Sequence, residues 1–380
     1  MKAPQKMQAK IQERIQYGAL RTLSIQKQTI DFSSNDYLGF AKSETIFNKA
    51  HQFLIDRNLK QNGATGSRLL SGNSELYEEV ETQISAFHNG EAALLFNSGY
   101  DANIGFFSSV PQRGDIILYD EYIHASIRDG IGMSNAKSFK FKHNDLEDLA
   151  KKVINISQKL DTSNQEVYIV TESVFSMDGD SPNLLKLVQF CNKNNCHLVV
   201  DEAHALGVFG NQGEGLLQEL GLEKKVFARI YTFGKALGCH GAVVIGSKEL
   251  KTYLTNFARS FIYTTGLSPH AIATIKVAYD QLSKTSAIQQ LKKRIVTFRE
   301  MTTSLPFIVS ESAIHCYIIA GNEKVKKVAN TLQSKDFDVK PIMSPTVSKG
   351  QERLRFCLHA YNSTEEIKKM IHILTNLEDK

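Results

Sequence analysis

Short apolar segments alternate with helical ones through most of the chain, and this alternation limits the fold more than any other feature of the sequence. Helical stretches such as Leu146–Leu160 and Leu184–Asn194 separate most of the apolar runs. The runs predict strands at Ala92–Phe96, Ile116–Tyr119, Val167–Val170, His197–Val200, Ala228–Thr232 and Ala242–Ile245. Strands that alternate with helices form a mostly parallel sheet covered on both faces. We therefore predict a large α/β domain over residues 44–275.

The pattern changes after residue 275, where the helical stretches become longer. Ser363 and Glu366 form a capping-box signature for the last of them. The predicted elements are helix Ile272–Leu305, strand Ile314–Ile319, helix Glu323–Gln333, strand Arg353–Leu358 and helix Thr364–Leu377. They predict a smaller C-terminal α+β domain over residues 276–380. Residues 1–43 are predicted to form an N-terminal helix, over 7–23, and an arm.

The composition is that of a globular protein and argues against several functions. Of 380 residues, 42% are hydrophobic and 22% are charged, and the net charge of +5 is too small and too evenly spread to indicate nucleic-acid binding. No apolar run approaches the ~20 residues of a transmembrane helix. Residues 1–20 lack the apolar core of a secretory signal. The five cysteines show no metal-ligand spacing. We expect a cytoplasmic protein with reduced thiols, no metal and no membrane partner.

Two residues at predicted strand ends point to a cofactor. Lys235 follows the strand Ala228–Thr232, whose last residue carries a hydroxyl. Asp201 directly follows the strand His197–Val200. In sheets of this kind, ligands bind outside the carboxyl ends of the strands. Pyridoxal phosphate (PLP) needs an amine for its aldehyde and a carboxylate for its pyridine nitrogen, so this pair predicts PLP. Asp201 could instead cap the turn after its strand.

Other polar residues follow neighbouring strands. The turn Asn97–Tyr100 leads from a strand into a helix, where backbone amides and the helix dipole favour a phosphate. Taken alone this turn is better explained as an ordinary one, but Thr232 as a second phosphate donor favours the phosphate site. His124 could lie over a flat cofactor ring or could be structural. Arg353 and Arg355 point the same way on their strand, so either could hold a substrate carboxylate, or both could lie on a solvated face.

Three more residues after strands are candidates for contacts with the cofactor. Ser176 could hydrogen-bond the cofactor hydroxyl, and Glu172 could act as an acid one layer behind it. Both could equally be polar residues of a surface loop. His204, three residues after Asp201, could bond the ring oxygen or could be a loop histidine.

Taken together, these segments resemble one family of enzymes. The chain resembles the α-oxoamine synthases, a branch of the fold-type I PLP enzymes, over essentially its whole length. The matching segments are Ser34–Gly39, Gly63–Gly72, Asn97–Tyr100, His124–Ser126, Thr171–Asp180, Asp201–Gly207, Thr232–Ala236 and Arg353–Arg355. Each is moderately specific, and eight of them in the right order are very specific.

The resemblance implies a fold and a set of residue roles. The fold is that of a fold-type I PLP-dependent transferase, with a mostly parallel, seven-stranded-type sheet in the large PLP-binding domain. Catalytic roles are implied for Lys235, as the Schiff-base lysine, for Asp201 and for His124. Contacts with the cofactor are implied for Ser98, Gly99, Tyr100, His124, Glu172, Ser176, Asp201, His204, Thr232, Lys235, Thr264 and Thr265. Contacts with substrates are implied for Arg21, Asn35, His124 and Arg355.

Three further expectations come from the same resemblance. Thr264 or Thr265 would reach the cofactor phosphate of a partner subunit, so the active unit should be a homodimer with the active site at its interface. The resemblance selects Arg355, not Arg353, as the residue that holds the carboxylate. Cys357 stands where relatives often carry threonine, which leaves the nearby contact with the acyl chain open.

The activity that the resemblance implies is PLP-dependent C-acyl transfer, in which an amino acid condenses with an acyl thioester and carbon dioxide is lost. The segments Gly66–Gly72, Lys142–Asp145 and Pro345–Gly350 favour the member that joins L-alanine to a pimeloyl thioester in biotin biosynthesis. The acyl carrier would be coenzyme A or an acyl carrier protein. The alternatives are sister enzymes that use glycine with acetyl-CoA or succinyl-CoA, or serine with a long acyl chain. A fold-type I aminotransferase and a non-catalytic PLP-binding protein are further alternatives.

Overall fold

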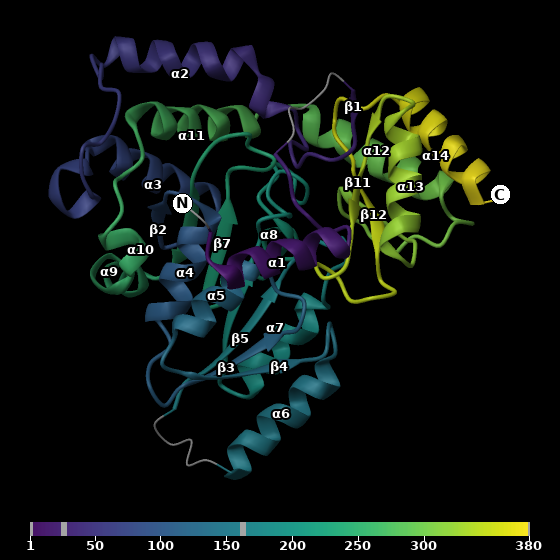
Figure 1. The fold of residues 1–380 in the computed structure, drawn as a ribbon. Helices are drawn as coiled ribbons and strands as arrows, with labels where there is room; N and C mark the ends of the chain where they lie inside the picture. The colour runs from purple at the N-terminus through teal and green to yellow at the C-terminus, as the bar shows by residue number, and fades with distance from the viewer. Residues whose placement is uncertain (1–2, 24–28, 160–164, 379–380) are drawn as a thin grey trace. The chain divides into compact units, whose positions relative to one another are not determined.

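The computed structural model describes residues 3–23, 29–159 and 165–378, and Figure 1 shows its helices and strands. The chain forms two compact units. The large unit comprises Asn35–Ser176 and Asp180–Leu291, and the small unit comprises Met1–Ser34, Met177–Gly179 and Lys292–Lys380. The two units are defined by their compactness alone, so the predicted domain boundaries near residues 43 and 275 remain a prediction.

The large unit is built on a seven-stranded sheet with the order β2-β8-β7-β6-β5-β3-β4 (Figure 1). β8 is antiparallel to both of its neighbours, and the other adjacent pairs are parallel. The bounds are β2 Ala92–Phe96, β3 Ile116–Asp120, β4 Lys137–Phe141, β5 Val167–Glu172, β6 His197–Asp201, β7 Ala228–Thr232 and β8 Ala242–Gly246. The predicted fold class, a mostly parallel sheet of the fold-type I architecture, is confirmed.

The strand β4 is missing from the sequence prediction. It forms an edge of the sheet and pairs with β3. Residues 137–140 of this strand are exposed, and Phe141 alone among its five residues is buried. A strand with little buried surface needs no apolar run, so the pattern that reveals the buried strands is absent here.

Helices cover both faces of the sheet, and each face has its own apolar core. On one face the helices are α4 (Gly99–Ser109), α5 (Ala125–Met133), α9 (Lys248–Phe257) and α10 (Arg259–Ile262). On the other face they are α6 (Leu146–Lys159), α7 (Leu184–Lys193) and α8 (Leu216–Glu219). Successive residues of β3 serve alternate cores, with Ile117 in the first and both Ile116 and Leu118 in the second. Burial on both faces explains why the central strands are apolar along their length.

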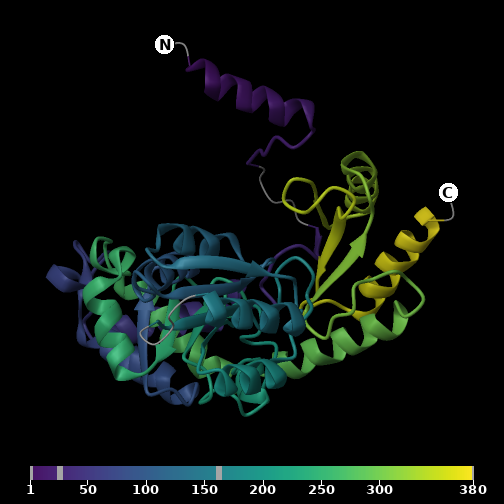
Figure 2. The same ribbon diagram turned by 90° about the horizontal axis from the view of Figure 1, so that it is seen from below.

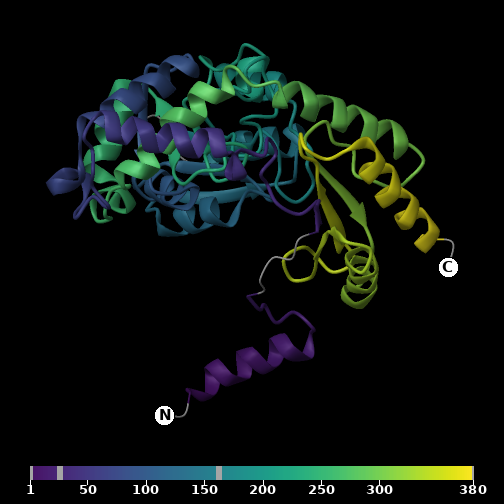
Figure 3. The ribbon, with the colours of Figure 1, turned by 90° about the horizontal axis from the view of Figure 1, so that it is seen from above.

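Three further helices complete the large unit. α11 (Pro269–Leu282) packs against α2 (Glu44–Asp56) and α3 (Glu75–Phe87), and α3 also packs against β2. Figure 3 gives the view from above, onto α2. Short helices, η1 (Phe40–Lys42) and η2 (Arg68–Gly72), precede α2 and α3 respectively.

The predicted long helix over Ile272–Leu305 is wrong, because the structure has two helices there, α11 and α12 (Ala287–Met301). The polar run of residues 283–286 separates them. The backbone N–H of Ala287 donates to Thr285 Oγ1 at 3.1 Å, which starts a new helix. Serine and threonine favour such helix ends because their side chains replace backbone partners.

The predicted N-terminal helix over 7–23 is also wrong in its extent, because α1 spans Gln5–Gln16. Gly18 has a φ of +59°, in the left-handed region. The N–H of Ala19 donates to the carbonyl of Arg14 at 2.8 Å, which closes the helix end. A left-handed glycine just past the last turn is a common helix stop.

The small unit combines a three-stranded antiparallel sheet with helices. The strand order is β11 (Lys340–Ile342), β12 (Arg353–Cys357) and β9 (Ile314–Ile318), and β1 (Ile30–Asp31) pairs in parallel with β10 (Phe337–Asp338). The helices are α1, the later part of α12, α13 (Asn322–Gln333) and α14 (Thr364–Glu378). Figures 2 and 3 show α12 and α14 side by side, and Arg294 Nη1 donates to Thr364 Oγ1 at 2.7 Å. Within the described ranges, no helix is both long and apolar enough to cross a membrane.

The predicted capping box of α14 is present and can be tested. The N–H of Glu366 donates to Ser363 Oγ at 3.1 Å, and the N–H of Ser363 donates to Glu366 Oε2 at 2.6 Å. Ser363→Ala removes the cap acceptor, so we expect the free energy of unfolding to fall by about 1 kcal/mol, measured by urea denaturation. The control is Thr331→Ala in α13, where the hydroxyl bonds the carbonyl of Lys327 in its own helix. An equal loss in both variants would contradict the capping role.

Candidate active site

The carboxyl ends of β5, β6 and β7 and the start of α4 surround a cavity of about 150 Å³ in the large unit. This is the edge at which parallel sheets bind ligands. The predicted site residues that line the cavity are Gly99, Tyr100, His124, Glu172, Asp201, Thr232 and Lys235. The lining also includes residues that the sequence prediction missed: Asn103, Ser126, Ala203 and Ile230.

Lys235 reaches the cavity from a tight turn after β7. The N–H of Gly238 donates to the carbonyl of Lys235 at 2.9 Å, and the N–H of Cys239 donates to the carbonyl of Phe233 at 3.0 Å. Phe233 itself is buried. Its side chain anchors the turn in the core, so the backbone of the half-buried Lys235 is held at a fixed place on the sheet edge.

The start of α4 and the end of β7 meet at one side of the cavity. A Cβ built on Gly99 would lie 3.2 Å from both Cβ and Oγ1 of Thr232. Glycine therefore lets the first turn of the helix approach the Thr232 hydroxyl closely. Ser98 caps the helix, because its Oγ accepts from the N–H of Asp101 at 3.1 Å and donates to Asp101 Oδ2 at 2.8 Å. Free amides at a helix start beside a hydroxyl suit a phosphate.

Asp201 ends β6 and is 7% exposed. Its Oδ1 accepts from the N–H of Ala203 at 2.9 Å, and its Oδ2 accepts from Asn103 Nδ2 at 3.0 Å. Asn103 lies one turn into α4, on the same buried side as Ala102 and Phe106. A polar residue among apolar helix positions is the signal that could have identified it from the sequence.

His124 is the N-cap of α5 and lines the cavity. Its Nδ1 lies 2.7 Å from Ser126 Oγ and accepts from the Ser126 N–H at 3.2 Å. Its own N–H donates to Glu172 Oε1 at 2.5 Å. Burial lowers the pKa of His124, and the positive charge of Lys235 adds to this effect against the opposing influence of Asp201. The imidazole is therefore neutral at physiological pH.

Glu172 ends β5 behind His124 and is almost fully buried. Burial raises the pKa of Glu172 to about 8, and the negative charge of Asp201 adds to the increase, while Lys235 and the hydrogen bond from His124 act in the opposite direction. Glu172 is therefore mostly protonated near neutral pH.

Five predicted residues of the large unit are not among the residues that line the cavity: Asn35, Ser176, His204, Thr264 and Thr265. His204 is buried, and its Nδ1 lies 2.7 Å from the hydroxyl of Tyr37. The Tyr37 hydroxyl also donates to Asn35 Oδ1 at 3.3 Å. Ser176 is buried at the end of the segment that follows β5. Thr264 and Thr265 are held by Asn97, whose Nδ2 donates to Thr264 Oγ1 at 3.1 Å and to the carbonyl of Thr265 at 2.6 Å.

The remaining predicted residues, Arg21 and Arg355, belong to the small unit. Arg21 is exposed. Within the small unit the two arginines of β12 differ: Arg353 is buried, forms an ion pair with Asp178 and donates to the carbonyl of Met177 at 3.1 Å. Arg355 is half-buried, and its Nη1 donates to Cys357 Sγ at 3.0 Å. Because Arg353 is already bonded to Asp178 and to the carbonyl of Met177, Arg355 is the better candidate for contact with a substrate.

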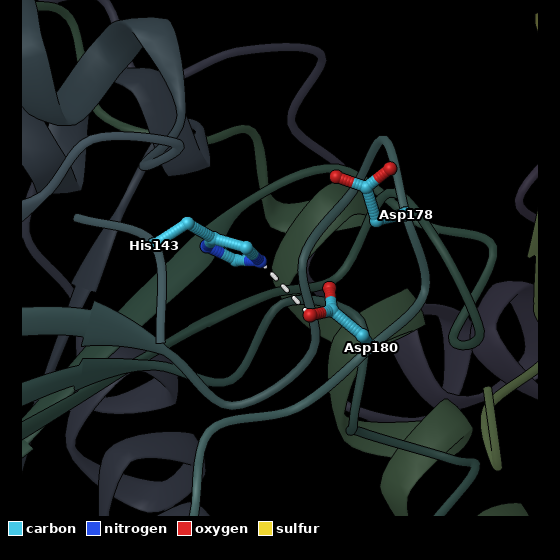
Figure 4. Close-up of side chains that lie close together, drawn as sticks. All are labelled: His143, Asp178 and Asp180. Carbon is cyan, nitrogen blue, oxygen red and sulfur yellow. Dashed lines mark hydrogen bonds and ion pairs between the residues drawn. The ribbon is translucent and has the colours of Figure 1, made fainter. Parts of the chain in front are cut away.

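His143, from the Lys142–Asp145 segment, ties two strand ends of the large unit together. Its Nδ1 lies 2.9 Å from Asp120 Oδ1 at the end of β3, and its Nε2 lies 2.9 Å from Asp180 Oδ2 (Figure 4). Burial alone would lower its pKa, but the hydrogen bonds and charges of the two carboxylates outweigh it and raise the pKa to about 9. His143 is thus a cation that joins the loops after β3 and β5. Asp178, also drawn in Figure 4, belongs to the small unit.

Comparisons with known proteins agree with this site. Residues 27–374 match the aminotransferase class I and II family. An 8-amino-7-oxononanoate synthase of Emericella nidulans is 42% identical over 364 residues, which cover 91% of this chain and 88% of the relative. The solved 8-amino-7-oxononanoate synthase of Francisella tularensis is 28% identical, with a TM-score of 0.77 over 92% of this chain and 98% of its own. A solved serine palmitoyltransferase with PLP is 25% identical, with a TM-score of 0.87 over 97% and 96%.

The chain therefore belongs to the aminotransferase class I and II family and, within it, to the α-oxoamine synthases. The curated relatives of this chain are named 8-amino-7-oxononanoate synthase or putative 8-amino-7-oxononanoate synthase. The predicted resemblance and the predicted enzyme class, a PLP-dependent C-acyltransferase of this type, are confirmed.

The residues of the cavity fit PLP. Lys235 offers an amine and Asp201 a buried carboxylate from neighbouring strands. Gly99 and Thr232 form a cradle for the phosphate that an added Cβ would narrow. Asn103 Oδ1 is a buried acceptor with no hydrogen-bond partner among the residues that the structure describes. An amine, a carboxylate, a phosphate cradle and an unsatisfied polar atom in one cavity match the groups of this cofactor.

The phosphate cradle predicts the effect of one methyl group. Gly99→Ala places a Cβ 3.2 Å from the Thr232 side chain, so we expect PLP to bind at least about tenfold more weakly, a change of ~1.4 kcal/mol. The measurement is an absorbance titration of the cofactor-free protein with PLP. Gly132→Ala in α5 is the matched control, because an added Cβ there has no atom within 4 Å. Equal affinities of Gly99→Ala and Gly132→Ala for PLP would show that the phosphate does not bind beside Gly99 and Thr232.

The raised pKa of Glu172 predicts a pH dependence of stability. An unfolded glutamate has a pKa near 4.5, and folding raises it to about 8, so the folded state holds a proton that the unfolded state has lost. The contribution of Glu172 to the free energy of unfolding is therefore greatest below pH 4.5 and falls as the pH rises from 4.5 to about 8. We expect the Tm of the wild type to fall more between pH 5.5 and 8.5 than that of Glu172→Gln.

The control for this titration is the exposed Glu75→Gln, which should keep the wild-type dependence. Glu202, whose pKa burial raises to about 7, contributes equally to all three proteins. Parallel Tm curves for the wild type and Glu172→Gln would contradict the assignment.

Proposed function

We propose that this chain catalyses the decarboxylating condensation of L-alanine with a pimeloyl thioester in biotin biosynthesis, giving 8-amino-7-oxononanoate, carbon dioxide and a free thiol. The observation that carries the proposal is Lys235 and Asp201 together in one cavity at the sheet edge. It is supported by a curated 8-amino-7-oxononanoate synthase that is 42% identical over 91% of the chain. The pimeloyl group is carried by coenzyme A or by an acyl carrier protein.

The cofactor is PLP, which supplies an aldehyde that joins amines and a ring that accepts electron density from the Cα of an amino acid. Lys235 holds the aldehyde at rest, and its released amine takes the Cα proton of alanine and later returns a proton to the product. Asp201 keeps the ring nitrogen protonated. Gly99 and Thr232, with Ser98 and Tyr100, hold the phosphate.

His124 and its neighbours complete the large-unit part of the site. His124 would cover the cofactor ring, and its neutral imidazole would donate a hydrogen bond to the thioester carbonyl, while Glu172 accepts the backbone N–H of His124. Ser176 and His204 contact the ring oxygen. The Tyr37 hydroxyl engages His204 Nδ1, so Nε2 is the nitrogen that faces the cofactor.

Substrate contacts and assembly are the parts of the proposal that rest most on the family. Arg355 holds the alanine carboxylate, and Arg21 and Asn35 contact substrate. The active unit is a homodimer in which Thr264 or Thr265 reaches the phosphate of the partner subunit's cofactor. In support, Asn97 belongs to the predicted phosphate-binding turn Asn97–Tyr100, and its side-chain amide donates hydrogen bonds to Thr264 Oγ1 and to the carbonyl of Thr265 in the same subunit.

Sister synthases share Lys235, Asp201 and His204, so the acyl and amino-acid substrates need a direct test. Backbone similarity does not separate them, because the TM-score is 0.87 with a serine palmitoyltransferase and 0.77 with an 8-amino-7-oxononanoate synthase. That score reports the shared fold, whereas sequence identity includes the side chains and is higher, at 42%, with a curated 8-amino-7-oxononanoate synthase.

The test measures thiol release by the PLP-loaded protein with four substrate pairs. L-Alanine with pimeloyl-CoA is compared with glycine plus acetyl-CoA, glycine plus succinyl-CoA, and serine plus palmitoyl-CoA. We expect release with the first pair at least about tenfold faster than with the others, since one tightly fitted substrate group is worth 1–3 kcal/mol. Faster release with a glycine or serine pair would assign the chain to a sister reaction.

A further inference from the structure

Two cavity residues outside the predicted set, Asn103 and Ser126, join the two groups on which the chemistry depends. Asn103 Nδ2 donates to Asp201 Oδ2 at 3.0 Å and to Ser126 Oγ at 2.9 Å. Ser126 Oγ lies 2.7 Å from His124 Nδ1. Both Asn103 and Ser126 are buried, at 3% and 1% exposure. The Asp201–Asn103–Ser126 part of this chain of contacts is thus shielded from water, His124 is exposed at its end, and all four residues lie within the large unit.

The direction of each hydrogen bond in this relay follows from what its atoms can do. An ionised carboxylate only accepts, so the Asn103 amide must present its nitrogen to Asp201. The second proton of that nitrogen goes to Ser126 Oγ. The Ser126 oxygen therefore already accepts one bond, and its single proton is available for His124 Nδ1.

A second donor at His124 Nδ1 fixes the tautomer. The backbone N–H of Ser126 donates to the same nitrogen at 3.2 Å. An N–H group cannot accept, so Nδ1 must offer its lone pair and cannot carry a proton. Because the pKa of His124 is lowered and its imidazole is neutral, its one proton resides on Nε2. The charged or titratable groups around the ring, Asp201, Lys235 and Asp129, come from three different elements.

We propose that Asn103 and Ser126 are positioning residues that transmit the fixed orientation of Asp201 to His124 and hold its imidazole as the Nε2–H tautomer. His124 then meets the substrate as a hydrogen-bond donor, not as a base. The same relay connects Asp201, which would pair with the cofactor nitrogen, to His124, which would cover the cofactor ring. This inference rests on the proposed function only for the identity of the substrate atom that Nε2 meets; the tautomer itself does not depend on it.

The test observes the tautomer directly, by NMR of protein labelled with ¹⁵N-histidine, recorded at pH 8 with and without PLP. The His124 signals are assigned by their loss in His124→Gln. We expect an unprotonated Nδ1 and a protonated Nε2 in the wild type. A protonated Nδ1, an equal mixture of tautomers or a doubly protonated ring would overturn the proposal.

Variants test whether the relay is the cause. Ser126→Ala removes the hydroxyl donor at 2.7 Å and leaves Nδ1 only the longer backbone N–H bond of 3.2 Å, so the Nδ1–H tautomer should gain population and the His124 Nδ1 signal should shift toward the protonated value. We expect kcat to fall about tenfold or more, with KM for L-alanine changed much less. Asn103→Ala should cause a smaller shift in the same direction, and Ser126→Thr, which keeps the hydroxyl, should restore the wild-type signal. If Ser126→Ala does not fold, Asn103→Ala and Ser126→Thr still give opposite expected results. A His124 signal unchanged in both alanine variants would overturn the relay.

The control is Ser109→Ala in α4, whose hydroxyl bonds the carbonyl of Gly105 in the same helix and should leave the His124 signals unchanged. The outcomes also separate this inference from the proposed function. Absence of acyl transfer from pimeloyl-CoA with the expected tautomer present would count against the proposed substrates alone. Normal acyl transfer with the wrong tautomer would count against the relay alone.

Discussion

A carboxylate buried at the end of a central strand is the constraint on which the rest of this site depends. Asp201 is 7% exposed, and a buried charge is stable only when it is paired or well hydrogen-bonded. The backbone N–H of Ala203 and the Asn103 amide supply two bonds. In the proposed function, a protonated ring nitrogen of PLP would supply the opposite charge, which would account for a carboxylate at this buried position.

The neighbours of Asp201 adopt protonation states that avoid a second charge of the same sign. Glu172 would repel Asp201 if it were ionised, and burial together with this repulsion raises its pKa to about 8. His124 stays neutral because burial and Lys235 lower its pKa. The cavity therefore presents a protonated Glu172 and a neutral imidazole beside Asp201 and Lys235. This is the distribution that holding a protonated ring and moving a proton at Cα require.

Much of the fold and of the site could be predicted from the sequence, because each buried strand can be recognised there as an apolar run. The strand ends at Asp201 and Thr232 follow from those runs, and with them the lysine and the carboxylate that line one cavity. The exposed β4 gives no such signal, and the break between α11 and α12 depends on local side-chain bonds. Asn103 could have been identified only as a polar residue among apolar helix positions, and the sequence does not show that its partners are Asp201 and Ser126. The burial of Arg353 and its ion pair with Asp178 distinguish it from Arg355, and no pattern in the sequence reveals either feature.

The central claim is that Lys235, at the end of β7, is the residue that carries the cofactor. The most direct measurement is borohydride reduction of the PLP-loaded protein, followed by digestion and mass spectrometry of the peptides. Reduction makes a lysine-bound cofactor permanent, so its position on the chain can be read. The account predicts the modification on Lys235 and its loss in Lys235→Ala. Modification at another lysine, or at the same level in Lys235→Ala, would contradict it.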